Sequence, residues 1–257
     1  ALDSLTLRNC SLTIAQPGLT MTVTNDVWVL PNAQLGVVGQ FSCRSLYLTN
    51  GGSLLVRSDV TNSATPDYGA LFTATQDVIL FTGSWIYPQS DITNGGSALF
   101  RMRNLTVAPN SGFDAGKRGF TAFYGPGTAG ANWGGGGHGG AGAAGAGAGG
   151  GKYGTNTAPL HAGSSGGDAY TEAGSGGGAV RIEASGTVSL DGTLQANGET
   201  GTYIHGGGGA GGSVFLKCRT FSATTNGTLK AVGGDGTLNG GGGGGGRIAL
   251  HYANRNV

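Results

Sequence analysis

The feature that most constrains the fold is a recurrence of 34 residues in the last third of the chain. One glycine-rich run leads into an apolar segment at Val180, a second into Val214 and a third into Ile248, and each step is 34 residues. A unit of this length cannot bury an apolar face by itself, so such units form a core only by stacking on one another. The recurrence therefore predicts a solenoid.

Short triplets with apolar residues at both ends run along the whole chain. Val27-Trp28-Val29 is followed 19 residues later by Leu46-Tyr47-Leu48. In most cases a second triplet begins six residues after such a triplet ends, and a third short strand precedes the pair. Period-two alternation without a lasting 3.6-residue pattern predicts an all-β protein. We expect one domain over residues 1–257, a right-handed parallel β-helix with three short strands per coil. Coils stack ~4.8 Å apart, with the middle residue of each triplet pointing outward. A β-sandwich is the alternative, although its two-residue hairpin turns join longer strands.

Glycine is the second constraint, because 56 of the 257 residues are glycine and many lie in an insertion at about 116–178. Such a segment has few side chains for a core and loses much entropy on ordering, so a disordered linker is one interpretation. The other is order through stacked, extended segments of polyproline II type, in which only glycine and alanine permit close approach. We favour long ordered loops whose glycine runs stack along one edge of the solenoid.

Charge and cysteine content limit the classes of partner. The formal net charge is +1, which predicts no nucleic acid and no membrane surface as partner, and no apolar run approaches a membrane span. Cys10, Cys43 and Cys218 cannot all pair, and we expect buried thiols rather than a disulfide, of which Cys10–Cys43 is one candidate. The chain begins without an initiator Met, so we expect a removed export signal or a domain cut from a longer protein.

Motifs for cofactors are weak. A G-x-G-x-x-G match at 140–145 lacks the strand before it and the helix after it that dinucleotide binding requires. The four histidines lack zinc-ligand spacing, so we expect no cofactor, with calcium at turns such as Gly167-Asp168 and Gly234-Asp235 as the alternative. Asp114, Lys117 and Arg118 form the one tight cluster of mixed charge. A glycosidase needs two carboxylates and a lyase needs a base beside a group that neutralises the uronate, so this cluster is the candidate site if the chain is a polysaccharide lyase or hydrolase.

Aromatic residues suggest a different role. Flat rings beside short polar side chains suit a sugar, whose C–H face packs on the ring while its hydroxyls form hydrogen bonds. Trp28 and Tyr47 are expected in one outward column, and Trp85 or Tyr87 in the neighbouring one. A second group lies around the glycine-rich loops. The predicted carbohydrate-binding residues are Trp133, Tyr124, Tyr153, Tyr170, Tyr203, Trp28, Tyr47, Trp85, Tyr87, Asp114, Lys117 and Arg118.

A family resemblance supports this hypothesis. The glycine-rich segments at 174–182, 192–198 and 240–250 resemble those of glycine-rich parallel β-helix domains from secreted bacterial proteins that degrade polysaccharides. Among these are β-helical carbohydrate-binding modules attached to xylanases. The resemblance implies a secreted, non-catalytic module that binds plant cell-wall polysaccharide, with xylan first, fused to a glycoside hydrolase; we expect a monomer. A structural or adhesive stalk is the further alternative.

Overall fold

A computed structural model shows a protein built from strands. It describes residues 1–257 except 17, 61–64, 122, 131–132, 168–172 and 257. The described residues form 18 strands in two sheets and no helix, and every strand pairing is parallel. The all-β class and the parallel sheets are therefore confirmed.

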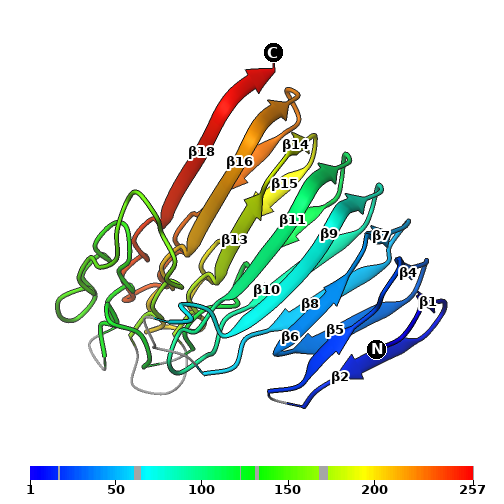
Figure 1. Cartoon of the computed structure of the whole chain (residues 1–257). Coiled ribbons are helices and arrows are strands. Elements are labelled where there is room, and N and C mark those ends of the chain that lie inside the picture. Colours follow the sequence, from blue (N-terminus) through cyan, green and yellow to red (C-terminus); the bar gives the residue numbers. More distant parts are fainter. Residues whose placement is uncertain (17, 61–64, 122, 131–132, 168–172, 257) are drawn as a thin grey trace.

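The larger sheet has eleven strands, most of them stacked in the order in which they occur in the chain (Figure 1). Towards the N-terminus of the chain, two short strands take the place of one long strand of this sheet, because β6 and β7 pair with the two halves of β9. Its strands are β1 (Leu5–Leu7), β3 (Thr20–Thr22), β4 (Val27–Val29), β6 (Gln40–Cys43), β7 (Leu46–Leu48), β9 (Ala70–Leu80), β11 (Ala98–Val107), β13 (Ala179–Ala184), β14 (Thr187–Leu190), β16 (Ser213–Ala223) and β18 (Arg247–Asn256).

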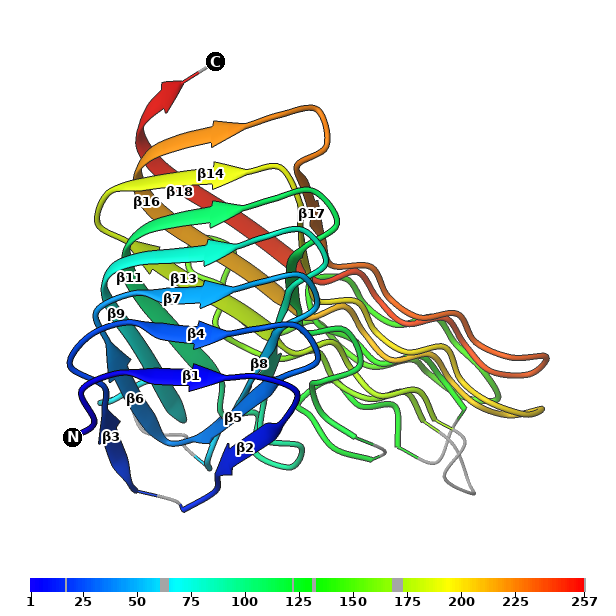
Figure 2. The same cartoon turned by 90° about the vertical axis from the view of Figure 1, so that its right-hand side faces the viewer.

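The second sheet has seven strands, and the chain passes alternately between it and the larger sheet (Figure 2). Because each pass returns above the previous one, strands of equivalent position become neighbours. Its order is β17 (Thr228–Lys230), β15 (Thr193–Gln195), β12 (Gly112–Asp114), β10 (Trp85–Gln89), β8 (Ser53–Arg57), β5 (Gln34–Val38) and β2 (Ser11–Ile14).

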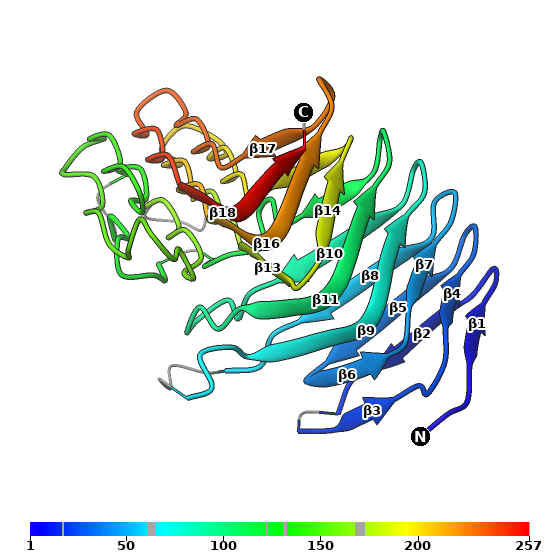
Figure 3. The ribbon, with the colours of Figure 1, turned by 45° about the horizontal axis from the view of Figure 1, so that its top comes forward.

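Register follows the repeat in the sequence. Val180 lies opposite Val214, which lies opposite Ile248, as the 34-residue recurrence predicts. The 19-residue step places Val27 opposite Leu46. Figure 3 shows that the long strands of the larger sheet, such as β9 and β11, bend along their length.

The core lies between the sheets and follows the predicted alternation. Val27 and Val29 are buried while Trp28 between them is 37 % exposed. A row of four phenylalanines crosses the interior, with successive ring centroids 5.7, 5.9 and 5.2 Å apart; these are Phe41, Phe72, Phe100 and Phe113. Burial of apolar side chains at every level of the stack stabilises the sheets.

The three cysteines are all free. Cys43 and Cys218 are buried, whereas Cys10 is exposed. Burial raises the pKa of Cys43 to about 12 and also raises the pKa of Cys218. The expected thiols in the core are confirmed for two of the three, and Cys10 does not pair with Cys43.

The glycine-rich segments form an ordered layered body beside the strands, which we name the glycine slab (Figure 2). It comprises residues 133–151, 161–167, 173–178, 196–201, 206–212 and 231–246. Backbone hydrogen bonds join its segments directly, for example from Gly174 N to Gly207 O at 2.8 Å and from Gly208 N to Gly241 O at 2.9 Å. The interpretation of a disordered linker is thus wrong for the described residues, and the glycine runs stack as predicted.

The hydrogen bonds of one slab segment repeat every three residues. The amides of Gly207, Gly208 and Gly209 donate to three different neighbours, at Gly167, Gly241 and Glu199. The next three amides return to the same three segments in the same order; Ala210, Gly211 and Gly212 donate to Ser164, Gly244 and Ala196. A β-strand bonds in two directions, whereas polyproline II has three residues per turn. The slab segment therefore has the polyproline II periodicity that the composition predicts.

Candidate functional site

Trp28 and Tyr47 occupy one outward column, as predicted. They are register partners on β4 and β7, and their rings stack with centroids 4.1 Å apart at an interplanar angle of 15°. Each ring therefore covers one face of the other, and Tyr47 is only half-exposed. A sugar packs on a free ring face, and in this pair each ring has lost one face to the other. Trp28 and Tyr47 are therefore poorly suited to bind a sugar, although they point outward.

Tyr87 lies outward on β10, but its ring is covered. The guanidinium carbon of Arg118 lies 4.7 Å from the ring centroid. Partial burial is the main cause that raises the pKa of Tyr87, and the nearby carboxylate of Asp114 adds to it. Tyr87, Arg118 and Asp114 therefore come together on the face of the second sheet.

The charged cluster predicted around Asp114 is held in structural contacts. Asp114 Oδ1 accepts the amide of Gly116 at 2.8 Å, and Lys117 Nζ pairs with Glu199 Oε1 at 3.2 Å. With Arg118 over the ring of Tyr87, all three side chains have partners. This arrangement positions the loop after β12, and it gives no specific support to an acid–base role.

Trp85 differs because the sheet leaves space beside it. Its register partner on one side is Ser53, and on the other side it is Gly112, which has no side chain. The next strand along places Thr193 opposite Gly112. Strands lie ~4.8 Å apart, so Trp85 and Thr193 stand roughly 10 Å apart with the glycine between them.

A groove of about 420 Å³ fills this space, and we name it the Trp85 groove. Its walls combine the indole with short polar side chains from three successive turns. The lining residues are Trp85, Pro109, Asn110, Asp191, Gly192, Thr193 and Asn226. A side chain at Gly112 is excluded, because a Cβ there would lie 1.8 Å from the carbonyl oxygen of Thr193.

The polar wall is organised by its own hydrogen bonds. Asp191 Oδ1 accepts from Asn226 Nδ2 at 3.0 Å and from the hydroxyl of Thr224. The hydroxyls of Thr193 and Thr228 lie 2.8 Å apart. These bonds fix acceptors and donors opposite an aromatic wall, which is the arrangement that binds sugar hydroxyls beside a C–H face.

Sequence reasoning predicted Trp85 but missed Asn110, Asp191, Thr193 and Asn226. These residues are far apart in the chain, and only the register of β10, β12 and β15 brings them together. The available signal was the spacing of the turns. Asp191 and Asn226 are 35 residues apart, which is close to the repeat length.

The aromatic residues around the slab have different environments. Trp133 stacks on His205 with centroids 4.0 Å apart, and its buried indole nitrogen has no hydrogen-bond partner among the described residues. Tyr203 is 79 % exposed and Tyr124 is 47 % exposed. Tyr170 lies outside the described residues.

Tyr153 serves the packing of the slab. Its hydroxyl donates to the carbonyl of Ala162 and accepts from Ser164 Oγ at 3.0 Å, and burial raises its pKa. Its backbone carbonyl accepts from Arg247 Nη2 at 2.7 Å. The polar end of the ring is thus used inside the protein, which makes Tyr153 less suited to a sugar platform, and its role in binding stays a prediction.

Within the described part of the chain, no three His, Cys, Asp or Glu side chains gather as metal ligands, and no helix is long and apolar enough to span a bilayer. Asp168 of the predicted calcium turn lies outside the described residues. Calcium binding stays a prediction.

Comparison with protein-family models, with curated proteins and with solved structures finds no match for this chain.

Proposed function

We propose that this chain is a non-catalytic carbohydrate-binding module and that the Trp85 groove is its principal site. The parallel register and the alternation of the chain between two sheets favour the right-handed parallel β-helix expected from the sequence. Such a frame presents equivalent turns at a regular rise, which suits an extended polymer.

One observation carries the proposal: Gly112 opens a space between the indole of Trp85 and the polar wall at Thr193. The space has an apolar side for a sugar ring and, on the other side, hydroxyl, amide and carboxylate groups for its hydroxyls. Trp28, Tyr47 and Tyr87 lack this combination, because another group covers a face of each ring.

The ligand class is a neutral hemicellulose, with xylan first. The groove holds one acidic residue, Asp191, and no basic one, so it favours hydroxyl groups over carboxylates. Xylan, secretion and fusion to a glycoside hydrolase rest on the family resemblance. A stalk without a glycan ligand predicts no binding at all.

The test is affinity gel electrophoresis of the wild type and variants in gels that contain xylan, glucomannan or xyloglucan. We expect retardation of the wild type and at least a tenfold loss of affinity for Trp85→Ala, because the aromatic wall is removed. Asn226→Ala should weaken binding less. Trp28→Ala is the matched control, since it deletes an equally outward tryptophan, and it should bind normally.

Unfolding midpoints of all variants separate loss of binding from loss of structure. If none of the three hemicelluloses retards the wild type, the proposal is wrong and the stalk is favoured. Equal losses for Trp85→Ala and Trp28→Ala in folded protein would remove the Trp85 groove as the site.

A further inference from the structure

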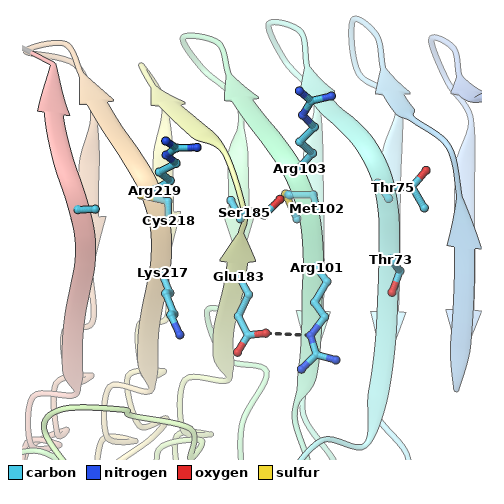
Figure 4. Close-up of a pocket in the computed structure, with 13 residues that line it drawn as sticks. Thr73, Thr75, Arg101, Met102, Arg103, Glu183, Ser185, Lys217, Cys218 and Arg219 are labelled. Atoms are coloured by element: carbon cyan, nitrogen blue, oxygen red, sulfur yellow. Dashed lines mark hydrogen bonds and ion pairs between the residues drawn. The ribbon is translucent and has the colours of Figure 1, made fainter.

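A second hollow lies on the larger sheet, where its long strands bend. The register of β9 with β11 shifts between Met102 and Asn104, and at the same level the chain leaves β13 at Ala184 before it enters β14 at Thr187. The outer surface along this bend encloses about 680 Å³ (Figure 4). We name this hollow, together with the adjoining one at Asn104 and Thr187, the basic trough.

Charged side chains stand on both sides of the bend. Register pairing places Arg101, Glu183 and Lys217 in one row across three strands. Arg103 and Arg219 lie on the opposite side of the bend from this row, as Figure 4 shows. The trough therefore carries four basic residues and one acidic residue, a net charge of +3 in a chain whose total is +1.

Most of this positive charge is not neutralised within the protein. Glu183 Oε2 lies 2.8 Å from Arg101 Nε, and Arg103 Nη1 donates to the neutral amide of Gln76 at 3.0 Å. Among the described residues, Arg103, Lys217 and Arg219 take part in no ion pair. All three side chains belong to exposed residues and can reach a ligand.

The trough continues beyond the bend. Next to the 680 Å³ hollow lies a smaller one of about 420 Å³. The two hollows share Arg103, Ser185 and Arg219, and the smaller one adds Asn104, Thr187 and Asn254. Hydrogen bonds from Asn104 Nδ2 to Asp77 Oδ1 and from the amide of Thr187 to Asn104 Oδ1 fix this part of the wall. The result is an elongated surface with separated cations. Apolar residues line its first part (Ala74, Met102, Ala184, Cys218 and Ala253), and hydrogen-bonding groups line its continuation.

The chemistry of this surface indicates a polymer of spaced anions. Arg101 and Lys217 lie two strands apart, roughly 10 Å, with Glu183 between them. A carboxylate or phosphate in the middle of this row would meet Glu183, so a densely charged strand such as nucleic acid fits poorly. Of the described residues that line the two hollows, none is an aromatic that could stack a base.

We propose that the basic trough binds an acidic polysaccharide through the carboxylates of its uronic acids. Planar carboxylates match the guanidinium forks of Arg103 and Arg219, and Ser185, Thr187 and Asn104 serve the sugar hydroxyls. The site is separate from the Trp85 groove, which lies on the other sheet and contains no basic residue.

The test is titration calorimetry with oligomers of polygalacturonate. We expect the wild type to bind them at low salt, with weaker binding in 0.5 M NaCl, because exposed charges are screened. Arg103→Gln combined with Arg219→Gln should weaken binding at least tenfold. Arg8→Gln combined with Lys152→Gln is the matched control, because it removes the same charge outside the trough, and it should bind normally.

Two further ligands distinguish carboxylate recognition from binding of other polymers. Fully methyl-esterified oligomers lack the carboxylate charge and should not bind, whereas tighter binding of a single-stranded oligonucleotide than of polygalacturonate would overturn the assignment. Wild type that fails to bind polygalacturonate, or a folded double arginine variant that binds it normally, would also overturn it. Trp85→Ala should leave this binding unchanged, so failure here and failure of the proposed hemicellulose site are distinguishable.

Discussion

His138 lies inside the glycine slab, where burial lowers its pKa to about 4. Its Nδ1–H donates to the carbonyl of Gly211 at 2.9 Å, while its buried Nε2 has no partner in the part of the chain that the structure describes. The charges of Arg247 and His161 further disfavour the protonated ring. His138 is therefore neutral in the folded protein over the whole neutral range, and this has a consequence for stability.

We predict that acid destabilises the protein through His138. The unfolded chain binds a proton near pH 6.5 and the folded protein only near pH 4, so this stabilisation is complete above about pH 6.5 and is lost as pH falls toward 4. The free energy of unfolding should drop by about 2–3 kcal/mol between pH 7.5 and 4.5, at ~1.4 kcal/mol per pKa unit.

Urea unfolding at the two pH values measures the change, and His138→Gln, which keeps a donor, should show a smaller one. An NMR titration gives an independent measure if that variant does not fold. Titration of the His138 ring above pH 6 in the folded protein would show that burial does not hold it neutral.

At the level of the element, the slab depends on the absence of side chains at specific positions. A Cβ on Gly209 would lie 2.0 Å from the carbonyl oxygen of Ser175 and 2.8 Å from that of Gly174, so it would collide with backbone atoms of the neighbouring segment. Gly245 belongs to the same slab, but no atom lies within 4 Å of its Cβ position.

We predict opposite outcomes for alanine at these two positions. Gly209→Ala should lower the free energy of unfolding by at least about 2 kcal/mol, because overpacking against backbone forces the segments apart. Gly245→Ala should be neutral or stabilising by about 0.5 kcal/mol, because alanine restricts the unfolded chain. Thermal unfolding of both variants measures this, and equal destabilisation would mean that the slab is not closely packed.

Much of each element could be predicted from the sequence. The spacing between Val27 and Leu46 and between Val180 and Val214 gives the register directly, since stacking repeats forces equivalent residues together. The linings of the two hollows could not be predicted in this way. The Trp85 groove depends on which turns flank Gly112, and the basic trough depends on a bend at Asn104 that no local pattern encodes.

For the whole molecule, the slab and the sheets share the same chain segments. The slab segment 206–212 continues into β16, and segment 240–246 continues into β18. Arg247 at the start of β18 also donates to the carbonyl of Tyr153, two residues beyond the slab segment 133–151. Separating the slab would therefore pull on the ends of the core strands.

We predict one cooperative unfolding transition for both parts. Variants that keep only Trp85 or only Trp133, with phenylalanine at the other tryptophan positions, report the sheet and the slab separately by fluorescence. Their denaturant midpoints should agree within error. An earlier transition at Trp133 alone would show that the slab unfolds independently.

The threefold hydrogen bonding of the slab has a thermal consequence. Segments of glycine joined by backbone amides expose little apolar surface on unfolding, and exposed peptide groups lower rather than raise the heat capacity. The slab's contribution to stability should thus vary little on cooling, whereas the contribution of the phenylalanine core weakens in the cold. In the repeats that contain both parts, the two parts therefore respond to temperature in different ways, and cooling weakens the contribution of the glycine part less.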